Sequence, residues 1–66
     1  MKWEKIATST WEESSSKSFD FVITKENRKF IMDIFDKGIK DDHDAYIESF
    51  EFNSLKEAKF DAEDHI

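Results

Sequence analysis

The fold is decided by one stretch late in the sequence, Phe50-Glu51-Phe52-Asn53-Ser54-Leu55-Lys56-Glu57-Ala58. The alternation of apolar and polar residues before Asn53 predicts a β-strand, and the residues after it predict the start of a helix. Ser54 and Glu57 have the spacing of a capping box, in which each side chain accepts a hydrogen bond from the backbone N–H of the other residue. The chain is therefore expected to run from a strand directly into a helix, which indicates an α+β domain.

Two further strands are predicted upstream of this junction. Apolar residues occupy alternate positions in 19–23 and again in 30–34, as is typical of strands with one buried face. The turn between them, 25–28, contains Asn27, which tolerates a positive φ, so the two strands are expected to form an antiparallel hairpin. A first strand is predicted from Trp3 to Trp11, and residues 14–18 are predicted to form a flexible loop.

The fourth strand is predicted from Ala45 to Phe52 and leaves one ambiguity. Glu48 has the same parity as Tyr46, Phe50 and Phe52. Either Glu48 lies at a sheet edge, or a bulge changes the parity of the strand.

The helix that follows is expected to bury one stripe of small and apolar residues: Leu55, Ala58, Ala62 and Ile66. Phe60 lies off this stripe and either curls around the sheet edge or is exposed. Together these elements predict a single small domain over residues 1–66. Its fold would be a three- or four-stranded antiparallel β-meander followed by one C-terminal helix packed on one face.

Composition excludes several kinds of protein. The chain of 66 residues contains no cysteine, which excludes disulfides and cysteine-based zinc sites. The longest wholly apolar runs have three residues, as in 21–23, which is too short to span a membrane. Neither is there a basic segment followed by an apolar one, as in a signal peptide, so we expect a cytoplasmic protein.

The net charge of −6 is unevenly distributed along the chain. Residues 1–32 carry six basic and five acidic side chains, whereas residues 33–66 carry four basic and eleven acidic ones. Such an acidic field repels nucleic-acid phosphates and attracts basic protein surfaces. The alternative interpretation is that the charge only maintains solubility.

No pattern in the sequence predicts catalysis. Asp41-Asp42-His43-Asp44 offers metal-binding side chains, but the spacing differs from that of a calcium loop, and a solvated loop is the favoured interpretation. His43 has no serine or cysteine companion at a recognisable spacing, and a single glycine excludes a glycine-rich phosphate loop. We therefore expect no enzyme activity, no metal and no cofactor.

Two sets of residues are candidates for binding another protein. The first is apolar, lies on the strand face opposite the predicted core, and consists of Val22, Ile31 and Phe35. These residues are a contact surface unless the N-terminal strand or its tryptophans cover them. The second set consists of carboxylates directed at a basic partner: Asp33, Asp36, Asp41, Asp42, Asp44, Glu48 and Glu51.

The strand-to-helix stretch, continued to Ala62-Glu63, resembles the ending of many small phage and bacterial domains. In these domains an antiparallel sheet is followed by a C-terminal helix that opens with Ser-Leu-x-x-Ala. The resemblance implies the same packing and transfers no functional residue. Some small acidic phage proteins inhibit host defence nucleases, so the resemblance implies an inhibitor as the sharper form of the protein-binding hypothesis.

Three functions are therefore weighed. The leading one is a non-enzymatic acidic protein-binding module, in its sharper form a phage-type inhibitor whose carboxylates imitate DNA phosphates. The alternative is a homodimeric structural or regulatory domain joined through the free sheet face or a sheet edge. The third is single-stranded nucleic-acid binding by the sheet, using its aromatic residues and the basic turn: Phe19, Phe21, Phe30, Lys25, Arg28 and Lys29.

Overall fold

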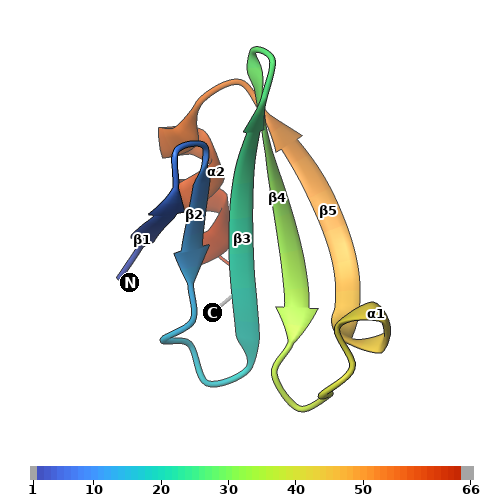
Figure 1. The fold of residues 1–66 in the computed structure, drawn as a ribbon. Helices are drawn as coiled ribbons and strands as arrows, with labels where there is room; N and C mark the ends of the chain where they lie inside the picture. The colour runs from blue at the N-terminus through green and yellow to red at the C-terminus, as the bar shows by residue number, and fades with distance from the viewer. Residues whose placement is uncertain (1, 65–66) are drawn as a thin grey trace.

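The computed structural model describes residues 2–64, and for Asp42 it describes the backbone only. Five strands and two short helices follow one another as β1 (Glu4–Ala7), β2 (Thr10–Glu13), β3 (Phe19–Glu26), β4 (Lys29–Asp36), α1 (Asp42–Ala45), β5 (Tyr46–Phe52) and α2 (Leu55–Glu63). The strands pair as antiparallel neighbours in chain order, so the sheet is a meander (Figure 1). The predicted α+β fold with an antiparallel sheet is thus found.

The central hairpin of β3 and β4 forms as the alternation predicted. Eight residue pairs join the two strands, from Phe19 opposite Asp36 to Glu26 opposite Lys29. The turn consists of two residues, and Asn27 has a φ of 57°. Asparagine tolerates this left-handed conformation better than most residues, which explains its position in a tight turn.

The predicted number of strands was wrong, because the segment from Trp3 to Trp11 is not one strand. It folds back at Thr8-Ser9, and β1 and β2 form a hairpin of their own. The carbonyl of Ser9 accepts a hydrogen bond of 2.8 Å from the N–H of Lys25, which fixes this turn against β3. The second correction is α1, a single helical turn within the connection that was expected to be a charged loop.

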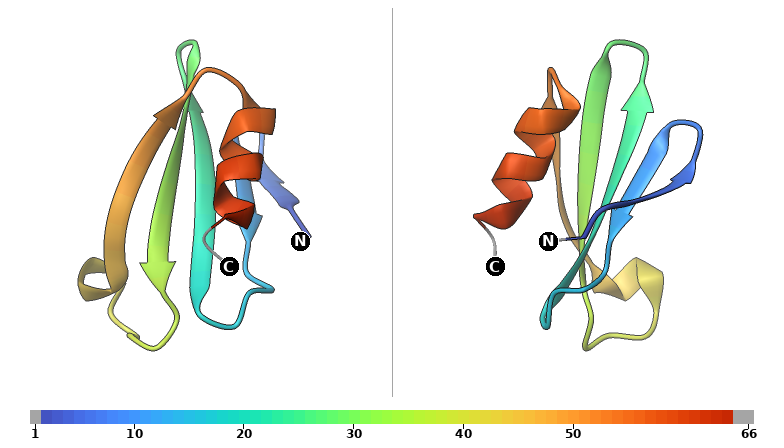
Figure 2. Two further views of the ribbon diagram at one scale, coloured as in Figure 1. Left: turned by 180° about the vertical axis from the view of Figure 1, so that it is seen from behind. Right: turned by 90° about the vertical axis from the view of Figure 1, so that its left-hand side faces the viewer.

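Helix α2 covers one face of the sheet, and α1 lies on the opposite side (Figure 2). The buried core consists of sheet residues and two helix alanines: Phe21, Ile23, Met32, Ile34, Ala58 and Ala62. The small side chains of Ala58 and Ala62 let the helix approach the sheet closely, as the stripe predicted. Ile66, the last member of that stripe, lies outside the described residues.

The capping serine at the start of α2 is confirmed. Ser54 has extended backbone angles, and its hydroxyl accepts a hydrogen bond of 3.1 Å from the N–H of Glu57. One of the helix's free N–H groups is thereby satisfied, as the first half of the capping box requires. Phe60 does not curl around the sheet edge, because 68% of its surface is exposed.

Candidate functional site

The face of the sheet opposite α2, which we call the open face, carries a row of residues that crosses all five strands. The strand register aligns Glu4, Glu12, Val22, Asp33 and Ser49. Direct cross-strand partners have side chains on the same face of a sheet. The row therefore places three carboxylates on the open face around one apolar residue.

Rows on either side complete this surface. One row contains Thr10, Thr24, Ile31 and Glu51, and the other contains Asp20, Phe35 and Tyr46. Val22, Ile31 and Phe35 are half-buried and lie on neighbouring strands; we call them the apolar cluster. Each member has a carboxylate as a direct cross-strand partner. Val22 pairs with both Glu12 and Asp33, Ile31 pairs with Glu51, and Phe35 pairs with Asp20.

The tryptophans do not cover the apolar cluster. Trp3 and Trp11 pack against the core on the α2 side of the sheet, so that part of the predicted alternative was wrong. Lysines lie over the faces of these rings instead. The Nζ atom of Lys59 is 5.8 Å from the ring centroid of Trp3, and that of Lys5 is 5.6 Å from the ring centroid of Trp11.

One end of the open face is partly enclosed by the segment that follows β4. Ala45 is buried there, with 3% of its surface exposed, whereas Ile39 is 43% exposed. Between this segment and the sheet lies a groove of about 410 Å³, which we call the open-face groove. It is lined by apolar side chains and three carboxylates, with two lysines among the lining residues: Val22, Phe35, Ile39, Ala45, Glu12, Asp20, Asp36, Lys37 and Lys40.

Hydrogen bonds between side chains order the β5 side of the open face. The hydroxyl of Ser49 donates to Asp33 Oδ1 at 2.5 Å, across β4 and β5. The Tyr46 hydroxyl lies 2.5 Å from the Ser49 hydroxyl. Asp33 is thus held at one place on the face, while Glu51 beside Ile31 is exposed.

Two of the predicted carboxylates cap local backbone turns. Asp36 Oδ1 accepts a hydrogen bond of 2.8 Å from the N–H of Gly38, and Asp41 Oδ1 accepts one of 2.9 Å from the N–H of His43 at the start of α1. Asp44 is exposed in α1, and the side chain of Asp42 is outside the described part. Asp36 ends β4 and the other three residues follow it, and none of the four joins the row of Glu4, Glu12, Val22, Asp33 and Ser49.

Like Asp36, which pairs with Phe19, Glu48 lies by register on the other face of the sheet. It pairs with Ile34, a core residue, so its side chain is on the α2 side of the sheet, where it is exposed. Both alternatives offered for Glu48 are found. β5 is an edge strand, and its pairing with β4 has a bulge at Ile47: Tyr46 pairs with Phe35, and Glu48 pairs with Ile34.

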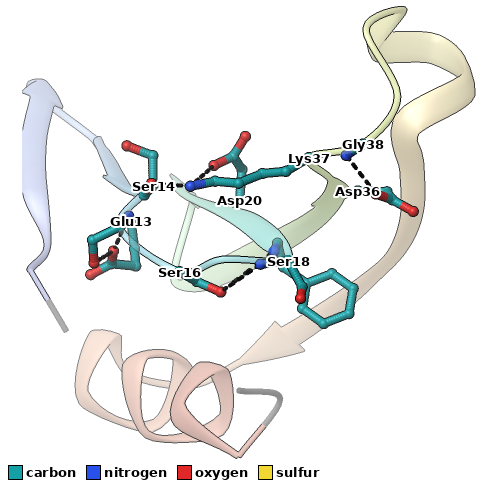
Figure 3. Close-up of polar contacts among 10 residues, drawn as sticks. Glu13, Ser14, Ser16, Ser18, Asp20, Asp36, Lys37 and Gly38 are labelled. Carbon is teal, nitrogen blue, oxygen red and sulfur yellow. Dashed lines mark hydrogen bonds and ion pairs between the residues drawn. The ribbon is translucent and has the colours of Figure 1, made fainter.

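Lys37 ties the loop before β3 to the open face (Figure 3). Its Nζ atom donates a hydrogen bond to the carbonyl of Ser14 and lies 3.6 Å from Asp20 Oδ1. The predicted loop 14–18 is confirmed as a loop, and it is internally bonded. Ser16 is buried, and its hydroxyl accepts hydrogen bonds of 3.4 Å from the N–H groups of Ser18 and Phe19.

Glu13, at the end of β2, is a charged group with no exposed surface. Its Oε1 atom accepts hydrogen bonds from the N–H of Ser15, at 2.6 Å, and from the Ser15 hydroxyl. Burial by itself would raise the pKa of Glu13, but these bonds and one from the Lys2 backbone outweigh it and lower that pKa. Glu13 is therefore held as a carboxylate and holds the loop in place.

The sequence-based prediction missed two carboxylates of the open face, Glu4 and Glu12. Both precede the acidic half of the chain, and both belong to the unrecognised hairpin of β1 and β2. The signal that reveals them is the pairing of Glu4 with Glu12, which follows only once the chain is known to turn at Thr8-Ser9.

Neither a metal-binding cluster nor a membrane-spanning helix is found within the described residues. In that part of the chain no three side chains of histidine, cysteine, aspartate or glutamate come together in a way that would hold an ion. Neither of the two helices described has the length and apolar character needed to cross a bilayer.

Comparisons with protein-family models, with curated proteins and with solved structures found no match. The resemblance to small phage and bacterial domains therefore stays a prediction.

Proposed function

We propose that this chain is a non-enzymatic module that binds a basic surface of another protein through its open face. The observation that carries the proposal is the pairing of each residue of the apolar cluster with a carboxylate on a neighbouring strand. An apolar centre with a charged surround is the usual composition of a protein contact surface. The carboxylates select a partner with lysine or arginine around an apolar patch.

The electrostatics support the same class of partner. With a net charge of −6, the molecule attracts cationic surfaces over distances of about a Debye length, ~10 Å at 0.1 M salt. Complementary charge mainly speeds association and selects the partner, while the apolar contact resists dissociation. The affinity is therefore expected to fall as the salt concentration rises, but binding should persist if the partner covers the apolar cluster.

In its sharper form, the proposal names a nucleic-acid-binding protein as the partner. The basic surfaces of such proteins are built to neutralise phosphates, and the open-face carboxylates offer the same charge on a fixed scaffold. A phage-type inhibitor of a host protein would act in this way. The cytoplasm is the compartment we propose for it.

The two other hypotheses fit the open face less well. A symmetric dimer through this face would bring Glu12, Asp33 and Glu51 of both copies close together, where like charges repel. Single-stranded nucleic acid would meet the same repulsion. Of the aromatic residues considered for base stacking, Phe21 is fully buried in the core, and Lys25 lies over the Phe30 ring, with its Nζ atom 5.7 Å from the centroid.

The proposal is tested by comparing two variants with the same change in charge. One replaces open-face carboxylates, as Glu12→Gln, Asp33→Asn and Glu51→Gln. The other replaces carboxylates around α1, as Asp41→Asn, Asp42→Asn and Asp44→Asn. Each immobilised variant is exposed to host lysate at low and high salt. The proposal expects a basic partner that the first variant loses and the second retains.

Two results would contradict it. Equal loss from both variants would show that net charge alone decides binding. A partner whose affinity is the same at low and high salt would exclude the phosphate-imitating form. Circular dichroism of both variants verifies that the fold is intact.

A further inference from the structure

Two carboxylates of the open face flank Val22 and have no cation of their own. In the strand register Glu12, on β2, and Asp33, on β4, are the direct partners of Val22. Among the described residues no basic side chain forms an ion pair with either carboxylate, whereas Asp20 has Lys37 at 3.6 Å. Glu12 and Asp33 are also half-buried. A partner therefore meets two unneutralised charges with an apolar residue between them.

The geometry of the sheet sets the distance between these two charges. Neighbouring strands lie about 4.8 Å apart, so Glu12 and Asp33, two strands apart in one row, leave the backbone roughly 10 Å from each other. Val22 lies midway between them. The hydroxyl of Ser49 donates to Asp33 Oδ1 and holds that side chain in place. The row thus presents a fixed spacing of charge, apolar residue and charge across the strands.

A helix can match this spacing, and an extended chain cannot. Residues i and i+7 of an α-helix are about 10.5 Å apart along the axis and lie on the same stripe. Residues i+3 and i+4 lie on that stripe between them. In an extended chain, side chains on one face are about 6.7 Å or about 13 Å apart, at i+2 and i+4 respectively. The spacing therefore favours a helix that lies across the strands.

The open-face groove offers such a helix an apolar contact. Its lining includes Glu12 and Val22 from the row, together with the apolar side chains of Phe35 and Ile39. An amphipathic helix binds by laying its apolar side in a groove of this kind. The charged ends of the contact are then left to the carboxylates.

The two lysines in the lining do not cancel its acidic character. Lys37 donates a hydrogen bond to the Ser14 carbonyl and lies beside Asp20, so its charge is already matched within the molecule. Lys40 is exposed. Three carboxylates and two lysines line the groove, which leaves it one negative charge before Asp33 is included.

We propose that the partner segment is an amphipathic helix with lysine or arginine at positions i and i+7 and apolar residues at i+3 and i+4. It lies across the strands, with one cation at Glu12, the other at Asp33, and the apolar residues over Val22. The inference rests on the proposed function, and it adds the secondary structure and the charge spacing of what the open face binds.

Three synthetic peptides of about 18 residues, a length at which alanine-rich helices form in water, serve as the probes. The first is alanine-based, with lysine at i and i+7 and leucine at i+3 and i+4. The second has the same composition, but its second lysine is at i+5, about 140° around the helix from the first lysine. The third is the first peptide with proline at i+2, on the side away from the leucines, which breaks the helix.

NMR titration of the wild type with each peptide, up to about 1 mM, measures the affinities. The first peptide should bind about tenfold more tightly than the other two, and it should shift the amide signals of β2, β3 and β4. Glu12→Gln and Asp33→Asn should each weaken its binding about threefold, as expected for one lost ion pair. Glu48→Gln is the matched control: it makes the same charge change at an exposed position on the α2 side, and it should leave the affinity unchanged.

Equal affinity for the three peptides, or no binding of any of them, would overturn the inference. An equal loss of affinity in Glu48→Gln would overturn it too, because net charge would then decide the binding. These results leave the proposed function standing if a basic protein from the lysate still depends on the open-face carboxylates. Selective binding of the first peptide with no basic partner in the lysate would support the helix geometry and refute the proposed function.

Discussion

Tyr46 lies opposite Phe35 on the open face, although the strand register on the other side of Ile47 pairs Glu48 with Ile34. The Phe35 and Tyr46 ring centroids are 6.0 Å apart, and the rings meet edge to face at 67°. The irregular pairing at Ile47 thus moves an aromatic residue from the parity of the core onto the open face. It also brings the Tyr46 hydroxyl to Ser49, and through Ser49 to Asp33.

Replacing Tyr46 by alanine should lower the free energy of unfolding by about 1 kcal/mol, because an edge-to-face aromatic pair contributes roughly 0.5–1.5 kcal/mol. Tyr46→Phe keeps the ring and loses only the hydroxyl, so it should cost less. Urea denaturation of both variants measures the difference. Equal losses would show that the hydroxyl, and not the ring contact with Phe35, is the source of the stability.

Glu13 should make stability depend on acidity. Its pKa is lowered in the folded chain, so the folded state favours the charged form of Glu13. The charged side chain therefore stabilises the fold at pH values above the ordinary glutamate pKa. This stability is lost as the pH falls through that value toward the lower pKa of the folded state. Glu13→Gln should therefore be destabilising at neutral pH, and the difference from the wild type should shrink as the pH falls below the ordinary glutamate pKa.

Denaturation curves at a series of pH values measure this effect, and Glu12→Gln is the matched control from the neighbouring position on the open face. A constant difference between wild type and Glu13→Gln across the whole series would show that the hydrogen bonds with Ser15 do not depend on the charge.

The helix cap should be measurable in isolation. Ser54→Ala removes the hydroxyl that accepts from the Glu57 N–H, and it should lower the free energy of unfolding by about 1 kcal/mol. Ser54→Gly should cost only a few tenths of a kcal/mol, because glycine is itself a tolerated cap. If alanine and glycine are equally costly, the lost stability does not come from the cap.

The close approach of α2 to the sheet should not tolerate a larger side chain. Ala58 has no exposed surface, so Ala58→Leu must displace sheet side chains and should cost about 1–3 kcal/mol. Ala7→Leu makes the same change at an exposed position of β1 and should stay within about 0.5 kcal/mol. Thermal or urea denaturation compares the two, and equal effects would contradict tight packing beneath α2.

The sequence predicted best where a pattern was long and a turn residue was distinctive. The hairpin of β3 and β4 has eight residues in each strand and Asn27 in its turn, and its buried face was correctly identified. The hairpin of β1 and β2 was missed because its strands have four residues each and its turn, Thr8-Ser9, contains residues that also suit strands.

The candidate site was predicted best where it lies on the long, regularly patterned hairpin of β3 and β4. The apolar cluster lies on β3 and β4 and was identified by parity alone. Asp20 shares the parity of Val22, whereas the carboxylates Glu4 and Glu12 depend on pairing across β1, β2 and β3, which no local pattern reveals. Helix α1 is one turn long, too short for periodicity, and only the capping Asp41 marked its start.

The position of Glu48 has a consequence for how this molecule behaves when it is crowded. β5 is seven residues long and lies at the edge of the sheet, and an unprotected edge of that length is a template on which further chains add strands and aggregate. A strand added to β5 would have to place a neighbour beside the charge of Glu48 and follow a strand made irregular at Ile47. The opposite edge, β1, has only four residues and an irregularity of its own. Both edges of the sheet are thereby guarded against amyloid-like growth.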